Sequence, residues 1–101
     1  MIPKQIPATA EQIAALCRRW HIRKLAFFGS VLRDDFGPAS DVDVLVEFEP
    51  GRTPGLNVYD LEQELSQLCG GRRIDMVNPK YINRWLKDEV LSTAEAAYVQ
   101  G

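Results

Sequence analysis

Three groups of residues in this sequence carry side chains suited to metal and phosphate chemistry. They are Gly29-Ser30, Asp41-Val42-Asp43 and Asp75. Hard divalent cations such as Mg²⁺ prefer oxygen ligands and usually bind through one or two carboxylates together with substrate phosphates. Glycine lets the backbone approach a ligand closely, and the N–H groups of a following helical turn attract anions. The three groups together predict a site for a metal-bound phosphate compound.

Each group also has a simpler interpretation. Asp41 and Asp43 lie two apart at the start of a predicted strand, so they share a face and repel each other without a cation. The same pair is typical of a turn or a cap. Asp75 is costly to bury unless it is paired or binds metal, but it could also be an exposed residue of an edge strand. Gly29-Ser30 alone is typical of a strand-to-helix turn, and the chain has no GxxxxGK phosphate loop.

The elements that must position these residues follow from the hydrophobic periodicity and from the glycines and prolines. Helices are predicted over residues 9–20, 57–69 and 82–93, the first with a Thr9/Gln12 capping box. Strands are predicted over residues 22–28, 42–48 and 73–77, and a helical turn over 31–35. Residues 96–99 fit either the end of the last helix or a short edge strand.

The connections between strands indicate the fold class. A short connection joins the first two strands and permits antiparallel pairing, whereas a helical crossover joins the second and third and suggests parallel pairing. We therefore expect an α+β fold, with a small mixed sheet packed against helices. The length of 101 residues predicts a single domain over residues 1–101.

Composition and charge exclude several classes of protein. With 46% hydrophobic and 26% charged residues, the chain is neither low-complexity nor disordered, and no apolar run is long enough for a bilayer span or a signal peptide. A net charge of −2 argues against direct nucleic-acid binding, while residues 34–64 carry a net −8 that suits a divalent metal or a solvated face. Cys17 and Cys69 are expected to be buried thiols, which favours a reducing cytoplasm.

The combined pattern G-S-x10-D-x-D over residues 29–43 closely resembles the signature of the DNA polymerase β-like nucleotidyltransferase superfamily. The most similar group is the minimal nucleotidyltransferases, stand-alone prokaryotic domains. Arg33 and Ser40 match positions usual in these small members, and residues 71–77 look like the strand of their third aspartate.

The resemblance implies a role for each residue. Gly29 and Ser30 would hold the triphosphate of ATP, with Arg33 neutralising phosphate charge and Ser40 completing the nucleotide site. Asp41 and Asp43 would bind two Mg²⁺ ions that bridge the phosphates. Asp75 would bind the catalytic metal and help to activate an acceptor hydroxyl, as in two-metal catalysis.

By the same resemblance, the expected activity is Mg²⁺-dependent transfer of AMP from ATP to a hydroxyl, most simply a tyrosine of a HEPN-type ribonuclease toxin, with this chain as antitoxin. The alternatives are a non-catalytic antitoxin that acts by docking, and transfer to a small molecule. A chain of this length leaves no room for a substrate domain, so we expect a macromolecular partner to supply the acceptor.

Other notable residues have ordinary interpretations. His21 is expected to serve as a cap or surface residue, and Trp20, Tyr81 and Trp85 to lie in the core or an interface. Arg72 and Arg73 could contact the nucleotide or a partner, but we expect a solvated pair.

Overall fold

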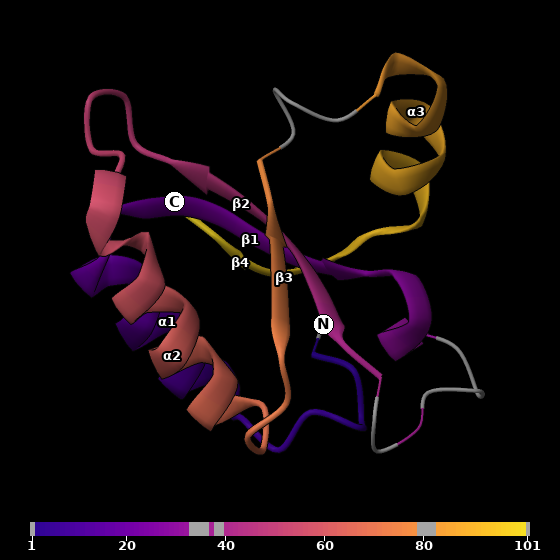
Figure 1. The fold of residues 1–101 in the computed structure, drawn as a ribbon, viewed down its shortest axis with the longest axis horizontal. Coiled ribbons are helices and arrows are strands. Elements are labelled where there is room, and N and C mark those ends of the chain that lie inside the picture. Colours follow the sequence, from indigo (N-terminus) through magenta and orange to yellow (C-terminus); the bar gives the residue numbers. More distant parts are fainter. Residues whose placement is uncertain (1, 33–36, 38–39, 79–82, 101) are drawn as a thin grey trace.

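A four-stranded mixed sheet with the order β3-β2-β1-β4 forms the centre of the fold (Figure 1). The computed structural model describes residues 2–32, 37, 40–78 and 83–100. Helices α1 and α2 lie side by side against the strands, while α3 lies apart from them, beyond the strands. In chain order the elements are α1 (Ala10–Arg19), β1 (Ile22–Phe28), η1 (Gly29–Leu32), β2 (Val42–Phe48), η2 (Gly55–Asn57), α2 (Val58–Leu68), β3 (Ile74–Val77), α3 (Arg84–Thr93) and β4 (Glu95–Val99).

Helix α1 begins with the predicted capping box. The Gln12 backbone N–H donates to Thr9 Oγ1 at 3.1 Å, and the Thr9 N–H donates to Gln12 Oε1 at 2.9 Å. These two bonds satisfy donors that a helix start otherwise leaves unpaired. The helix buries Ile13, Leu16 and Cys17 against the sheet, as the apolar periodicity predicts.

The predicted strand pairings are confirmed. β1 pairs antiparallel with β2, and β2 pairs parallel with β3 across the α2 crossover. The structure also decides between the two possibilities for the C-terminal segment, because β4 pairs antiparallel with β1 as an edge strand. The predicted helical turn over 31–35 begins earlier, as the 3₁₀ helix η1 from Gly29, and residues 33–35 lie outside the described residues.

The hydrophobic core lies between the sheet and the pair α1 and α2. Its fully buried side chains include Leu25 and Phe27 of β1, Val44 of β2 and Leu61 and Leu65 of α2. Cys17 and Cys69 are buried in the same core as free thiols, which confirms the sequence prediction. Burial raises the pKa of Cys17 to about 12 and that of Cys69 to about 11, so both remain protonated at neutral pH.

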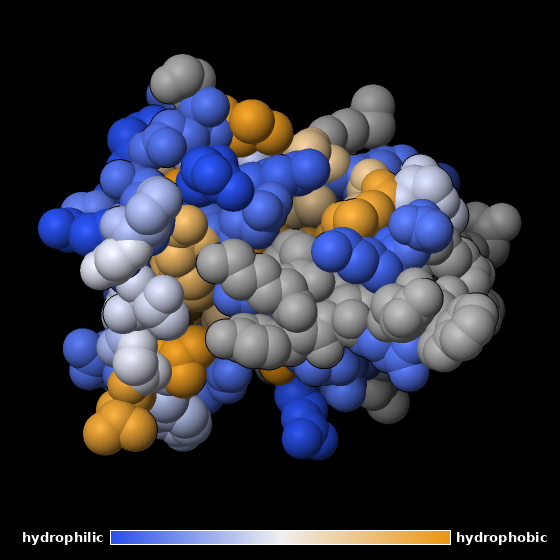
Figure 2. Space-filling view, turned by 90° about the horizontal axis from the view of Figure 1, so that it is seen from above, coloured by the Kyte–Doolittle hydropathy of each residue, from blue (hydrophilic) through white to orange (hydrophobic). Residues whose placement is uncertain are grey.

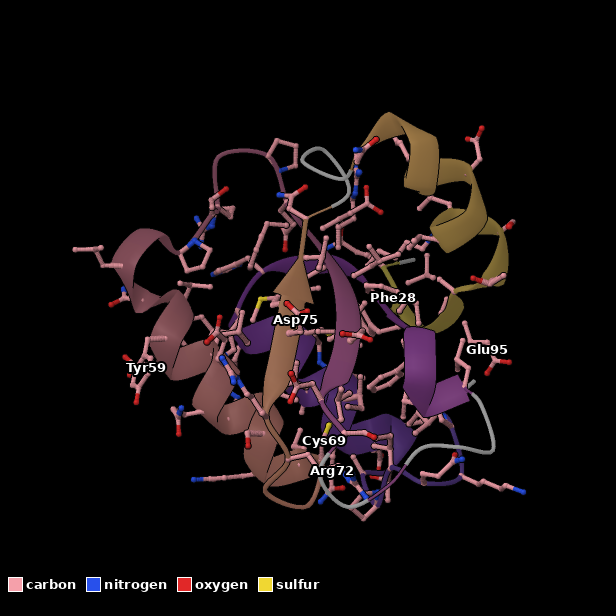
Figure 3. All side chains as sticks on the ribbon, turned by 45° about the vertical axis from the view of Figure 1, so that its right-hand side comes forward. Phe28, Tyr59, Cys69, Arg72, Asp75 and Glu95 are labelled. Atoms are coloured by element: carbon pink, nitrogen blue, oxygen red, sulfur yellow. The ribbon has the colours of Figure 1, made fainter. Side chains whose placement is uncertain are left out.

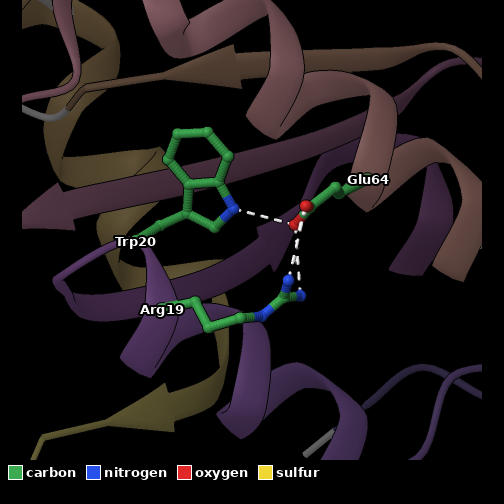
Figure 4. A network of polar contacts seen from close by, with 3 residues as sticks. All are labelled: Arg19, Trp20 and Glu64. Carbon is green, nitrogen blue, oxygen red and sulfur yellow. Dashed lines mark hydrogen bonds and ion pairs between the residues drawn. The ribbon is translucent and has the colours of Figure 1, made fainter.

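A polar network joins the C-terminal end of α1 to the middle of α2 (Figure 4). The indole Nε1 of Trp20 donates to Glu64 Oε2 at 2.8 Å, and Arg19 Nη2 lies 3.1 Å from the same oxygen. The Arg19 ion pair is exposed and therefore contributes little, whereas the partly buried indole bond fixes the position of Glu64. The network thus fixes the position of α2 relative to α1. Among the described residues, no helix is long and apolar enough to cross a membrane.

Candidate active site

The parallel register of β2 and β3 brings two of the predicted aspartates together. Asp43 pairs with Asp75, between the pairs Val42–Ile74 and Val44–Met76. Val42 and Ile74 are buried on the helix-covered side. Because side chains alternate along a strand, Asp43 and Asp75 project together from the opposite face. The sheet therefore places two carboxylates from distant parts of the sequence in adjacent positions.

Asp75 lies on the exposed edge of the sheet, and Asp43 lies further inside. β3 is an edge strand that carries the exposed Asp75 (Figure 3). Asp43, on the next strand, is half-buried. Asp75 is thus the edge-exposed residue that the simpler interpretation expected, and it still lies beside Asp43. An exposed carboxylate at this edge is accessible to a large acceptor molecule.

The backbone of Gly29 packs directly against the carboxylate of Asp43. Gly29 has a φ of +75°, and a Cβ at this position would clash with Asp43 Oδ2. The contact arises because Phe28, the last residue of β1, pairs with Asp43 across the antiparallel ladder. Glycine is therefore required here both by its backbone conformation and by space. The structure joins the Gly29 motif to the aspartate motif at one point.

Asp41 is exposed and lies one residue before β2, next to a tight turn. Ser40 closes this turn, since its N–H donates to the Gly37 carbonyl and its Oγ accepts the Gly37 N–H, both at 3.1 Å. The Ser40 hydroxyl can still donate its own proton to a ligand. Its position is therefore compatible with the nucleotide-binding role that the resemblance implies.

Arg72 is not the solvated residue that the sequence predicted, and that prediction was wrong. It is half-buried, and its Nη1 donates to the Gly37 carbonyl at 2.5 Å (Figure 3 labels the residue). Its own carbonyl accepts a bond from Ser66 Oγ of α2 at 2.6 Å. Arg72 thus ties α2 to the turn that precedes Asp41. The exposed Arg73 fits the prediction.

We expect Arg72→Met to lower the free energy of unfolding by about 1–3 kcal/mol, because it leaves a part-buried carbonyl without its charged donor. The measurement is urea unfolding followed by circular dichroism. Arg73→Met is the matched control, and as a change at an exposed site it should alter stability by less than about 0.5 kcal/mol. Equal stabilities for the two variants would contradict the anchoring role of Arg72.

Two predicted site residues cannot be placed. Arg33 lies outside the described residues, and for Ser30 only the backbone within η1 is described. Their predicted roles remain predictions.

The described residues fit a divalent metal in part. Within this part of the chain, no group of three or more His, Cys, Asp or Glu side chains is close enough to hold a metal ion. The structure therefore brings Asp43 and Asp75 together but does not complete a three-carboxylate cluster with Asp41. Mg²⁺ needs only one or two carboxylates when phosphate oxygens fill its other positions, and Asp43 Oδ2 lies against the backbone of Gly29, where η1 begins. The donor chemistry is thus that of a magnesium site shared with a phosphate ligand.

Comparisons with known proteins agree with this geometry. Residues 10–97 match the sequence profile of the nucleotidyltransferase domain family. The chain is similar to the protein adenylyltransferase MntA of Thermococcus cleftensis, with 35% identity over 83% of this chain and 81% of the relative.

Solved structures show the same fold. A protein described as a candidate minimal nucleotidyltransferase superimposes with a TM-score of 0.69 and 36% identity, over 84% of this chain and 85% of the other. A chain of a toxin–antitoxin assembly with AMP-PNP also gives a TM-score of 0.69, with 18% identity, over 91% of this chain and 74% of the other. At that identity the second likeness concerns the fold alone.

Proposed function

Because this chain belongs to the nucleotidyltransferase domain family, we propose that it transfers AMP from ATP to a hydroxyl of a partner protein. The acceptor in this proposal is a tyrosine of a HEPN-type toxin, which the chain inactivates as its antitoxin. The observation that carries the proposal is the pairing of Asp43 with Asp75, together with the contact between the Asp43 carboxylate and the backbone of Gly29. This arrangement offers carboxylate oxygens next to the backbone that would hold a phosphate.

The proposed reaction forms a bond between the acceptor oxygen and the α-phosphorus of ATP and breaks the bond to the pyrophosphate. The backbone at Gly29 and Ser30, with the side chains of Ser30, Arg33 and Ser40, holds the triphosphate. Asp41 and Asp43 would hold Mg²⁺. Bound Mg²⁺ would supply positive charge that stabilises the phosphates in the transition state.

Asp75 acts on the acceptor in this scheme. It shares its face of the sheet with Asp43 and is exposed at the edge, so an incoming hydroxyl can reach it. It accepts the proton that the acceptor oxygen loses and contributes to the metal site. In this scheme the half-buried Asp43 serves the nucleotide, and the exposed Asp75 serves the acceptor.

The comparisons support a protein as the acceptor. The Thermococcus cleftensis relative, 35% identical to this chain, is named a protein adenylyltransferase. The experiment is incubation of the chain with ATP, Mg²⁺ and a HEPN-type toxin as the proposed partner, followed by intact mass measurement. A gain of AMP on the partner supports the proposal. An unchanged partner that is nevertheless neutralised would favour docking alone, and AMP appearing on a small molecule would favour the third alternative.

A further inference from the structure

Two large apolar side chains stand in solvent where α2 begins. Leu56 in η2 is 98% exposed and Tyr59 in the first turn of α2 is 64% exposed. Among the described residues only Leu91 and Val99 are also exposed at this size, and both lie on other elements. On the left of Figure 2, the end where Figure 1 places η2 and α2, hydrophobic groups lie open between hydrophilic ones. Neither Leu56 nor Tyr59 contributes to the core.

An apolar pocket of about 250 Å³ adjoins this end of α2. It lies at the C-terminal ends of β2 and β3. Its apolar walls come from both strands and from the segment leading into α2, namely Val46, Phe48, Pro54, Val58 and Met76, and its polar side chains include Glu62 and Asn78. Such a lining suits one large apolar side chain.

A second hollow, of about 420 Å³, leads from the pocket to the candidate active site. Its floor includes four successive residues, Arg73 to Met76, and its other wall is the α2 face that carries Tyr59. Successive residues of a strand can line one groove only along the strand's edge, and β3 is an edge strand. Glu62 and Met76 line both hollows, so the two adjoin each other along the edge of β3, and Asp75 lines the second. We call the two hollows together the groove.

The groove has features of a site for an extended polypeptide. An edge strand offers backbone groups to a further strand, and pockets beside it select side chains. The ionisable side chains that line the two hollows are Glu62, Asp75 and Arg73, a small excess of acid. Asp60, next to Tyr59, is also exposed and adds to that excess. A segment with apolar and basic side chains complements this surface.

We propose that the groove, which includes Tyr59, Glu62, residues 73–76 and Asn78, binds an extended segment of the acceptor protein, and that the exposed Leu56, next to the lining residue Gly55, also contacts that segment. A large apolar side chain of that segment enters the pocket, a basic side chain lies beside Glu62, and the acceptor hydroxyl lies at Asp75. Asp75 and Asn78 are three residues apart along the chain, or about 10 Å. The apolar anchor therefore lies two to three residues from the acceptor residue. This inference rests on the proposed function.

The test separates acceptor binding from nucleotide binding. Leu56→Asp should raise the KM for the HEPN-type partner about tenfold or more. The reason is that the variant places a charge where the bound partner would bury apolar surface. The Kd for ATP should change less than about twofold, since Leu56 touches neither Gly29 nor the aspartates. Val99→Asp is the matched control, as Val99 is 62% exposed on β4 at the opposite edge of the sheet, and it should leave both constants unchanged.

A second variant tests the charge argument. Glu62→Gln keeps the shape of the pocket wall and should also raise the KM for the partner, with a weaker dependence of KM on salt than in the unmodified chain. If the unmodified chain adenylylates the partner and Leu56→Asp and Glu62→Gln both match Val99→Asp, the groove is not the docking site. If the unmodified chain transfers no AMP to the partner, the proposed function fails and this inference fails with it.

Discussion

Asp43→Asn is expected to lower the rate of AMP transfer at least about a thousand-fold, while the fold stays intact. A bound metal ion contributes several kcal/mol of transition-state stabilisation, and each 1.4 kcal/mol changes the rate by a factor of ten. Loss of a charged carboxylate that holds the metal removes part of this stabilisation. Asp43 is the residue that contacts Gly29 on one side and pairs with Asp75 on the other. Asparagine keeps its shape and removes its charge. The measurement is the single-turnover rate with ATP and the partner protein, with circular dichroism to verify the fold.

Glu47→Gln is the matched control for this prediction. Glu47 lies on the same strand, and its carboxylate pairs with Arg23 at 3.2 Å, away from Asp43. Its replacement should change the rate less than about twofold, since an exposed ion pair contributes little. If Asp43→Asn transfers AMP as fast as Glu47→Gln, Asp43 has no role in the active site. If Asp43→Asn still neutralises the toxin without transfer, docking alone accounts for the antitoxin role.

Gly29→Ala adds one methyl group, and we expect it to lower both the transfer rate and the stability. Its φ of +75° disfavours any side chain by about 1–2 kcal/mol, and the added Cβ would clash with Asp43 Oδ2. To relieve the clash, the Asp43 carboxylate or the start of η1 must move. We therefore expect the transfer rate to fall about a hundred-fold or more, because misplacing a reacting group costs this much. The rate and the free energy of unfolding should both be measured.

Gly51→Ala separates backbone strain from the clash. Gly51 has the same φ of +75°, but a Cβ there would meet nothing within 4 Å. The Gly51→Ala variant should be destabilised by the backbone strain alone and should keep the transfer rate of the unmodified chain. If Gly29→Ala and Gly51→Ala have equal stabilities and equal rates, the contact between Gly29 and Asp43 has no functional importance.

Local patterns predicted most of the fold. β1 and β2 have the bounds expected from short β-branched or aromatic runs that end at glycine or proline, and α1 begins at its capping box. The segment Glu95–Val99 could not be assigned, because two adjacent alanines give it neither helical nor alternating periodicity. Only its pairing with β1 makes it a strand, and that partner lies some 70 residues earlier in the chain.

The sequence proposed the residues of the candidate site, but it could not predict most of the contacts between them. The D-x-D spacing singled out Asp43, and the apolar neighbours of Asp75 in its strand singled out that residue; the parallel register places the two side by side. The bond from Arg72 to the Gly37 carbonyl spans 35 residues, so no local pattern could reveal it. A charged side chain next to another charged side chain is usually solvated, and here a backbone carbonyl from another loop overrides that tendency. The groove beside β3 likewise depends on how α2 packs, which periodicity does not determine.

The most direct test of the central claim is the intact mass of the HEPN-type partner after incubation with ATP, Mg²⁺ and either the unmodified chain or Asp43→Asn. We predict that the partner gains the mass of AMP on a tyrosine with the unmodified chain and gains none with Asp43→Asn. A partner that keeps its mass with the unmodified chain, or that gains AMP equally with Asp43→Asn, would contradict this account of the site.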